Sequence, residues 1–164
     1  MPGEQIKLTA IFDGWGAYQE KIAGTVSPLT PEQLMLRVAP QLRSIGEIAA
    51  HIIAVRVRWF TSVLQVDEAD VLPLAVWDRP APDAPARTSG ELAEGFAASW
   101  GMIARALALW TPADLAEVME GTRHGEAYAF TRQWVIWHVA EHDLHHGGEI
   151  SLTLGANSLQ APDI

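Results

Sequence analysis

The stretch WHVAEHDLHHGGE, residues 137–149, holds four of the six histidines of this 164-residue chain. A step of four residues turns an α-helix by about 400°, so two such side chains lie one turn apart on nearly one face. Two imidazoles on that face reach a common metal ion at about 2.0–2.1 Å. The spacing does not choose between His138 with His142, His142 with His146, and His142 with His145. We therefore predict a helix that carries part of a metal site.

A third ligand is available in the stretch SIGEIAAH, residues 44–51. Ser44 and Glu47 have the spacing of a capping box, which predicts a helix from there to about Leu64 with His51 inside it. His51 lies among isoleucines and alanines, so we expect it to be largely buried and to need partners for both ring nitrogens. A metal on one nitrogen and an acceptor on the other would satisfy it. Three neutral imidazoles leave coordination positions open, as in catalytic sites.

Charged residues near these histidines suggest supporting roles. Carboxylates can accept from the imidazole nitrogen that does not face a metal and so orient the ring. Arg58 follows His51 by seven residues on the same stripe of its helix, where it would suit a carboxylate-bearing ligand at an open metal position. The alternative interpretation is a solvated or snorkelling arginine. The candidate carboxylates are Glu47, Glu141, Asp143 and Glu149.

Apolar periodicity and capping signals predict an all-α chain that forms a single domain over residues 1–164. Short Thr-Pro turns at Thr30 and Thr111 precede the second and fourth long helices. The proline-rich residues 67–86 predict a long ordered loop anchored by Trp77, and residues 119–128, which include His124, predict a loop or a short hairpin. The predicted long helices span residues 5–23, 44–64, 88–110 and 130–154.

Composition excludes several classes of function. The chain has no cysteine, so any metal takes nitrogen and oxygen ligands, and any reactive thiol must arrive with a substrate. Its net charge is -9 and its eleven basic residues are dispersed, which argues against nucleic acid as a partner. No apolar run approaches the roughly 18 residues of a membrane span, and the first residues do not resemble a secretory signal. We expect a cytoplasmic protein with no membrane partner.

Two motifs together resemble those of the DinB-like (DinB/YfiT) superfamily. SIGEIAAH resembles its helix 2 motif, and HDLHHGGEI, residues 142–150, resembles its helix 4 motif His-x-x-His-His-Arg-Gly-Gln-Ile. Gly147 and Glu149 stand here in place of the arginine and the glutamine, which puts substrate contacts made by those two positions in doubt.

The resemblance implies an up-up-down-down four-helix bundle, often a homodimer, with a long crossover between helices 2 and 3. It also implies a metal triad of His51, His142 and His146. His138 and His145 then become neighbours of the site rather than ligands, with roles that stay open.

The resemblance also implies a function. Some members of the superfamily use a divalent metal to activate low-molecular-weight thiols such as bacillithiol, mycothiol or glutathione. We therefore expect a metal-dependent, S-transferase-like enzyme that acts on a small molecule with such a thiol. Zinc or nickel is the expected metal, with iron or manganese as alternatives. The alternative functions are a metal-dependent hydrolase and a non-catalytic, stress-related metal-binding protein.

Overall fold

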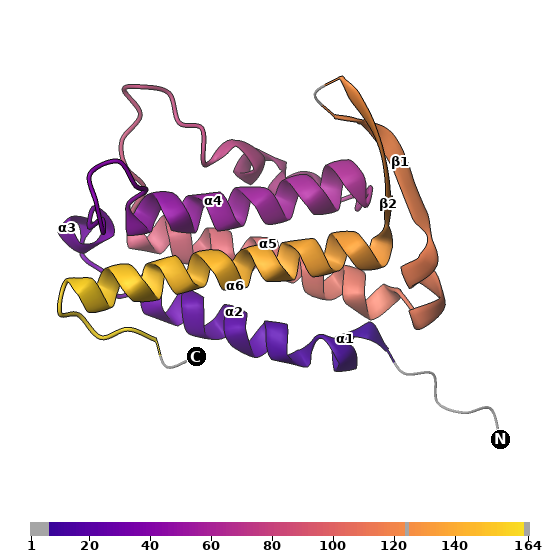
Figure 1. The fold of residues 1–164 in the computed structure, drawn as a ribbon, viewed down its shortest axis with the longest axis horizontal. Helices are drawn as coiled ribbons and strands as arrows, with labels where there is room; N and C mark the ends of the chain where they lie inside the picture. Colours follow the sequence, from indigo (N-terminus) through magenta and orange to yellow (C-terminus); the bar gives the residue numbers. More distant parts are fainter. Residues whose placement is uncertain (1–6, 124, 163–164) are drawn as a thin grey trace.

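The computed structural model describes residues 7–123 and 125–162 and is predominantly helical, with one two-stranded sheet (Figure 1). The helical fold class is thus confirmed. None of the helices in the described part of the chain combines the length and the apolar character needed to cross a bilayer. The elements are α1 (Leu8–Ile11), α2 (Asp13–Val26), α3 (Pro31–Leu34), α4 (Ile45–Arg58), the π-helical turn η1 (Trp59–Val63), the 3-10 helix η2 (Ala69–Val76), α5 (Ser89–Leu109), the 3-10 helix η3 (Pro112–Ala116), β1 (Val118–Arg123), β2 (Glu126–Thr131) and α6 (Arg132–Ala156).

The predicted capping boxes set the helix starts. At the start of α4 the Ser44 hydroxyl accepts from the Glu47 backbone N–H at 3.3 Å, and the Glu47 carboxylate accepts from the Ser44 N–H at 2.6 Å. The same reciprocal pair forms at Thr30 before α3 and at Thr88 before α5. The first long helix differs from its prediction: it is broken at Phe12 into α1 and α2, and residues 5 and 6 lie outside the described range.

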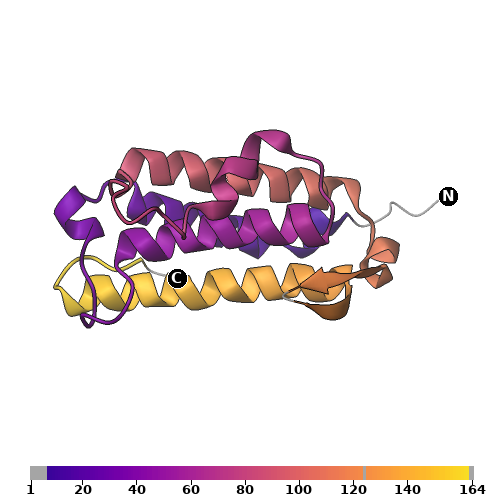
Figure 2. The same ribbon diagram turned by 90° about the horizontal axis from the view of Figure 1, so that it is seen from above.

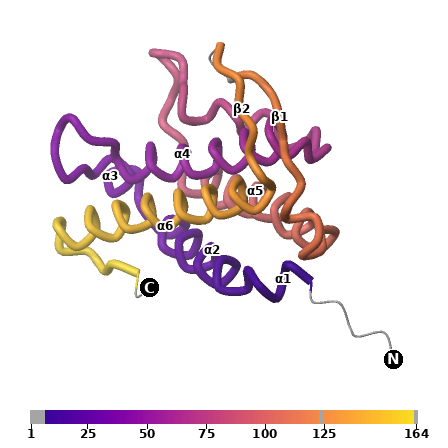
Figure 3. Tube along the Cα trace, turned by 45° about the vertical axis from the view of Figure 1, so that its right-hand side comes forward, coloured from indigo at the N-terminus to yellow at the C-terminus, as the bar shows by residue number. Residues whose placement is uncertain are grey.

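The four long helices lie side by side, but their directions differ from the up-up-down-down order that the resemblance implied. In Figure 1, α4 and α5 both run from left to right, whereas α2 and α6 run from right to left. Because α4 ends at the far side from the start of α5, the segment between them, residues 65–88, returns along the length of these helices (Figure 2). The tube view gives the same arrangement (Figure 3).

This returning segment is not simply the loop that its prolines predicted, since residues 69–76 form the 3-10 helix η2. Trp77 anchors it, as expected. The indole ring lies over Gly95 of α5, where a Cβ atom would come within 2.5 Å of it. The Arg87 guanidinium covers the ring at 3.8 Å from its centroid. The segment therefore has a defined path across α4 and α5.

A buried polar network joins all four long helices. Arg56 of α4 donates to Asp143 of α6 from Nε at 2.9 Å, and to Gln19 of α2 at 2.6 Å. The Trp15 indole N–H of α2 donates to the same Asp143 oxygen at 2.7 Å, and Ser99 of α5 lies 3.5 Å from Arg56. Asp143 was a candidate for orienting an imidazole. It faces the core instead, and its partner is Arg56.

The region predicted as a loop or short hairpin is a hairpin. Strands β1 and β2 pair antiparallel from Val118 opposite Thr131 to Arg123 opposite Glu126. His124 lies outside the described residues. The hairpin packs on η1, which continues α4, through aromatic rings, with the ring centroids of Phe130 and Trp59 5.8 Å apart.

Candidate metal centre

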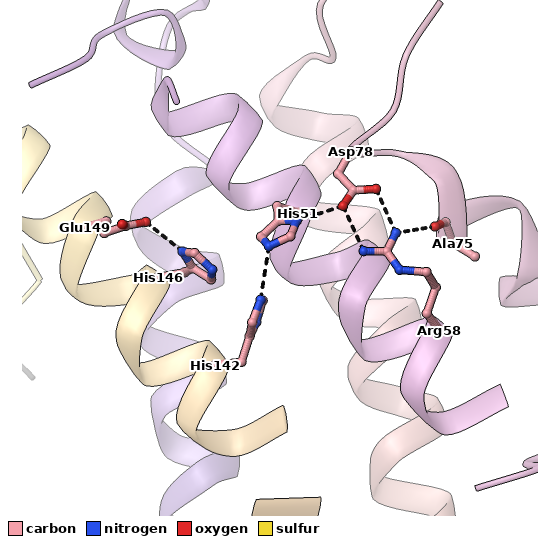
Figure 4. Close-up of polar contacts among 7 residues, drawn as sticks. All are labelled: His51, Arg58, Ala75, Asp78, His142, His146 and Glu149. Atoms are coloured by element: carbon pink, nitrogen blue, oxygen red, sulfur yellow. Dashed lines mark hydrogen bonds and ion pairs between the residues drawn. The ribbon is translucent and has the colours of Figure 1, made fainter. Parts of the chain in front are cut away.

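Three of the predicted histidines meet between α4 and α6. His51 projects from α4 towards His142 and His146, which lie one turn apart on α6 (Figure 4). The Nε2 atoms of His51 and His142 are 3.1 Å apart, and one nitrogen from each of the three rings lies within 4.8 Å of the other two. Two nitrogens bound to one ion at 2.0–2.1 Å lie about 3–3.4 Å apart when the angle is between octahedral and tetrahedral. The spacing of the first pair fits a shared ion.

The other two histidines of the α6 cluster face elsewhere. His138 stacks on Trp134, with ring centroids 5.0 Å apart and planes 8° apart, and meets the edge of Trp59. The side chain of His145 is 66% exposed on the outer face of α6. Of the pairs that spacing left open, the structure brings His142 and His146 to His51.

A carboxylate fixes the orientation of His51. Its Nδ1 lies 2.7 Å from Oδ2 of Asp78, which follows η2 within the returning segment. With Nδ1–H donating to that oxygen, Nε2 carries the lone pair that faces His142. Asp78 is held in turn by Arg58, whose guanidinium donates to both carboxylate oxygens at 2.7 and 2.8 Å and to the Ala75 carbonyl at 2.7 Å.

Glu149 has the same relation to His146, with Oε2 at 2.6 Å from Nδ1. It belongs to the carboxylates that the sequence proposed as imidazole partners. Two other candidate carboxylates contact groups outside the centre. Glu47 caps α4, and Glu141 lies 4.0 Å from His138. Two of the three imidazoles in the centre are thus backed by a carboxylate, as is usual for metal-bound histidines.

The fit to a cation rests on the lone pairs. The Nε2 atom of His51 is an acceptor, because the ring proton is on Nδ1, which donates a hydrogen bond to Asp78. Two nitrogen lone pairs 3.1 Å apart repel each other unless a proton or a cation lies between them. The Nδ1 atom of His142 is buried, and no described protein group hydrogen-bonds to it. A divalent metal that accepts imidazole would satisfy the convergent Nε2 atoms of His51 and His142, but not the Nδ1 atom on the other side of the His142 ring.

The surroundings of His51 and His142 keep these two imidazoles neutral. Burial, together with the neighbouring His146 and His51 rings, lowers the pKa of His142 to about 2. Burial also lowers the pKa of His51, although the hydrogen bond to Asp78 opposes this. Burial alone would raise the pKa of Asp78, but the hydrogen bonds from Arg58 and His51 hold it at about 2. His51 and His142 are therefore neutral ligands near neutral pH, and His51 is backed by the ionised Asp78 carboxylate.

Asp78 is the residue of the candidate centre that the sequence did not predict. It lies 27 residues from His51 along the chain, in a stretch where other aspartates were equally eligible. The only signal was its position beside the predicted anchor Trp77. Arg58 was predicted to contact a carboxylate-bearing ligand. Here its Nη atoms contact the Asp78 carboxylate, and contact with a ligand stays a prediction.

Comparison with known proteins gives a family and a fold. The family model for the DinB superfamily matches residues 17–150, a range that includes the triad and both of its carboxylates. No curated protein matches the chain by sequence.

Two solved structures share the fold. A DinB-like protein from Bacillus cereus superposes with a TM-score of 0.74 at 20% identity, over 98% of this chain and 99% of that one. A conserved protein from Enterococcus faecalis superposes with a TM-score of 0.67 at 16% identity, over 90% and 95% of the two chains. At these identities the likeness concerns the fold alone.

Proposed function

The chain belongs to the DinB superfamily, and on that basis we propose that it is a divalent-metal-dependent enzyme of S-transferase-like activity, which joins a low-molecular-weight thiol to a small-molecule substrate. The observation that carries the proposal is the convergence of His51, His142 and His146, with Asp78 and Glu149 behind two of the rings. Zinc or nickel is the proposed metal, with iron or manganese as alternatives.

Three imidazoles would hold the ion and leave further positions on it open. A divalent ion bound there would lower the pKa of a thiol or a water molecule that reached it. The protein's own contribution is orientation: Asp78 and Glu149 hold two of the rings, and Arg58 holds Asp78. A cavity of about 400 Å³ has Ile48 and Glu149 in its lining, so it shares the carboxylate of Glu149 with the centre.

The same contacts favour thiol chemistry over the alternative of hydrolysis. A hydrolase usually needs a general base within hydrogen-bonding reach of the attacking water. Among the described residues, the two carboxylates that contact the triad are both already engaged with imidazole N–H groups. A thiol with a lowered pKa needs no such base, because the thiolate is itself the nucleophile.

We infer further that α2, α4, α5 and α6 form one four-helix bundle as a single domain, with residues 65–88 as its long crossover. We also propose the homodimer that the resemblance implies. Trp137 and Leu144 support it, because they lie one heptad apart on the outer face of α6 and are 59% and 47% exposed. Light scattering on the purified protein would give twice 17.9 kDa for a dimer.

Metal analysis of purified protein tests the centre. The wild type is expected to bind one equivalent of zinc or nickel, and His51→Ala is expected to lose it. The matched control is His145→Ala, since His145 lies on the same helix as two ligands but outside the triad, and it should keep the metal. A wild type without stoichiometric metal, or a His51→Ala variant that binds as tightly as the control, would reject the centre.

Cobalt substitution tests the thiol. Glutathione and bacillithiol are the probes, and at least one is expected to change the visible spectrum of the cobalt protein by adding a sulfur ligand. If neither thiol changes the spectrum while the metal stays bound, the transferase proposal is wrong. Ester hydrolysis by the same sample would then favour the hydrolase. Inactivity in every assay would favour the non-catalytic metal-binding protein.

A further inference from the structure

A second cavity lies between the end of α4, the segment after η2 and the hairpin. Its volume is about 260 Å³. The lining side chains with polar groups share one property, which is that each can donate a hydrogen bond. They are Arg58, Trp59, Ser62, Arg79, Thr122 and Tyr128.

The charge of this lining is unusual for the chain. The whole sequence carries 20 acidic against 11 basic residues, yet the described lining residues include two arginines and no carboxylate. Arg79 has no side-chain hydrogen bond or ion pair among the contacts of the described residues. Arg58 is already bound to Asp78 and Ala75, so Arg79 is the cation available to a ligand, and a guanidinium group favours an oxyanion such as a carboxylate.

The aromatic walls indicate the shape of the rest of the ligand. Tyr128 lies across the hairpin from Gly121, where a Cβ atom would come within 2.5 Å of the Tyr128 hydroxyl. Its ring also stacks on Phe130 at 5.1 Å between centroids, with planes 12° apart. Trp59, which is 7% exposed, forms a second wall. Two fixed aromatic walls favour a flat apolar body.

Arg58 joins this cavity to the metal centre. It lines the cavity, and its Nη atoms hold both oxygens of Asp78, whose Oδ2 accepts from His51 (Figure 4). Arg79, the other cation of the cavity, directly follows Asp78 in the chain. An anion beside Arg58 shares the guanidinium charge, so Asp78 is less neutralised and accepts more strongly from His51. That change makes the His51 lone pair a better donor to a metal.

We propose that this cavity binds a small carboxylate with a flat apolar body, and that its occupancy tightens metal binding through Arg58, Asp78 and His51. The carboxylate site is inferred from the residues that line the cavity, whereas the coupling depends on the proposed metal centre. Linkage requires that the metal tighten carboxylate binding by the same factor, and we expect a factor of about five, near the low end of common allosteric couplings.

Calorimetry with benzoate on the zinc-loaded protein tests the cavity. Benzoate should bind, and Arg79→Gln should weaken it at least tenfold while leaving zinc affinity unchanged. Arg105→Gln is the matched control, because Arg105 is exposed and pairs with Glu68 away from the cavity. Equal benzoate affinity in these two variants, or no binding to the wild type, would overturn the proposal.

Two further probes separate shape from charge. Cyclohexanecarboxylate has the charge of benzoate without the flat ring, and inorganic phosphate has charge without an apolar body. Both should bind more weakly than benzoate. Phosphate binding at least as tight as benzoate binding would overturn the flat-body assignment and leave only a general oxyanion site.

The coupling has its own test. Benzoate should raise the zinc affinity of the wild type about fivefold, and this effect should disappear in Asp78→Asn while benzoate still binds. Zinc affinity that is independent of benzoate would overturn the coupling.

His51→Ala, which is expected to lack the metal, should still bind benzoate in the cavity. Loss of benzoate binding in this variant would instead place benzoate on the metal and overturn the cavity site. If the wild type binds no zinc but does bind benzoate, the proposed function fails while the cavity stands.

Discussion

At the scale of single residues, His51 depends on a partner far away in the chain. Its position inside α4 follows from the Ser44 cap, but the orientation of its ring follows from Asp78. Asp78 is itself positioned by three hydrogen bonds, two from Arg58 and one with His51. Such carboxylates commonly change metal affinity as much as 10–100-fold when they are replaced.

We therefore expect Asp78→Asn to lower zinc affinity about 10–100-fold, because the amide keeps the volume but loses the charge and the ion pair with Arg58. Competition with a chromophoric chelator measures the affinity. Asp83→Asn is the control, since Asp83 is exposed in the same segment. Equal affinities in the two variants, with equal helical content by circular dichroism, would show that Asp78 has no role in the centre.

At the scale of elements, the contact between α2 and α6 explains one departure from the family motif. The motif has arginine where this chain has Gly147, and Gly147 is buried against α2. A Cβ atom there would overlap the Tyr18 hydroxyl oxygen and lie 2.8 Å from Ile22. Tyr18 also donates to the Leu144 carbonyl at 3.2 Å. Even an alanine thus conflicts with the packing of Tyr18 on α6.

Gly147 and Gly148 are adjacent on α6, so substituting each by alanine gives a matched test of the contact between α2 and α6. Gly147→Ala should lower the free energy of unfolding by about 1–3 kcal/mol, because overpacking at Tyr18 exceeds the gain in helix propensity. Gly148→Ala should raise it by up to about 1 kcal/mol, because Gly148 is exposed and a Cβ atom there meets nothing within 4 Å. Urea denaturation measures both changes. A stabilised Gly147→Ala variant would contradict this account of the α2–α6 contact.

At the scale of the whole molecule, the Arg56–Asp143 pair holds the arrangement of the helices. Both side chains are 1% exposed, and their network reaches α2 through Gln19 and Trp15 and α5 through Ser99. Removing one partner of a buried ion pair leaves the other charge without compensation, which commonly costs about 3–5 kcal/mol. Asp143 lies between His142 and His146 on α6, so the buried polar network and the metal centre share this helix.

Asp143→Asn is expected to lower the free energy of unfolding by about 3–5 kcal/mol, because Arg56 keeps a buried charge without a carboxylate. Glu68→Gln is the comparison, because its partner Arg105 is exposed, and it should cost about 1 kcal/mol at most. Chemical denaturation at pH 7 measures both variants. Similar small losses in the two variants would mean that the buried pair does not hold the helices together.

The sequence by itself determined the helical class, the capped starts of α3, α4 and α5, and the set of histidines from which the centre is drawn. These features follow from hydrogen bonds and side-chain spacings within a few residues, so a short window of sequence contains them. Only the tertiary structure decided that α4 and α5 run parallel, that His142 and His146 rather than His138 face His51, and that Asp78 completes the centre. His51 lies 91 residues from His142 and 27 from Asp78, and which of such distant groups meet depends on how the whole set of helices packs.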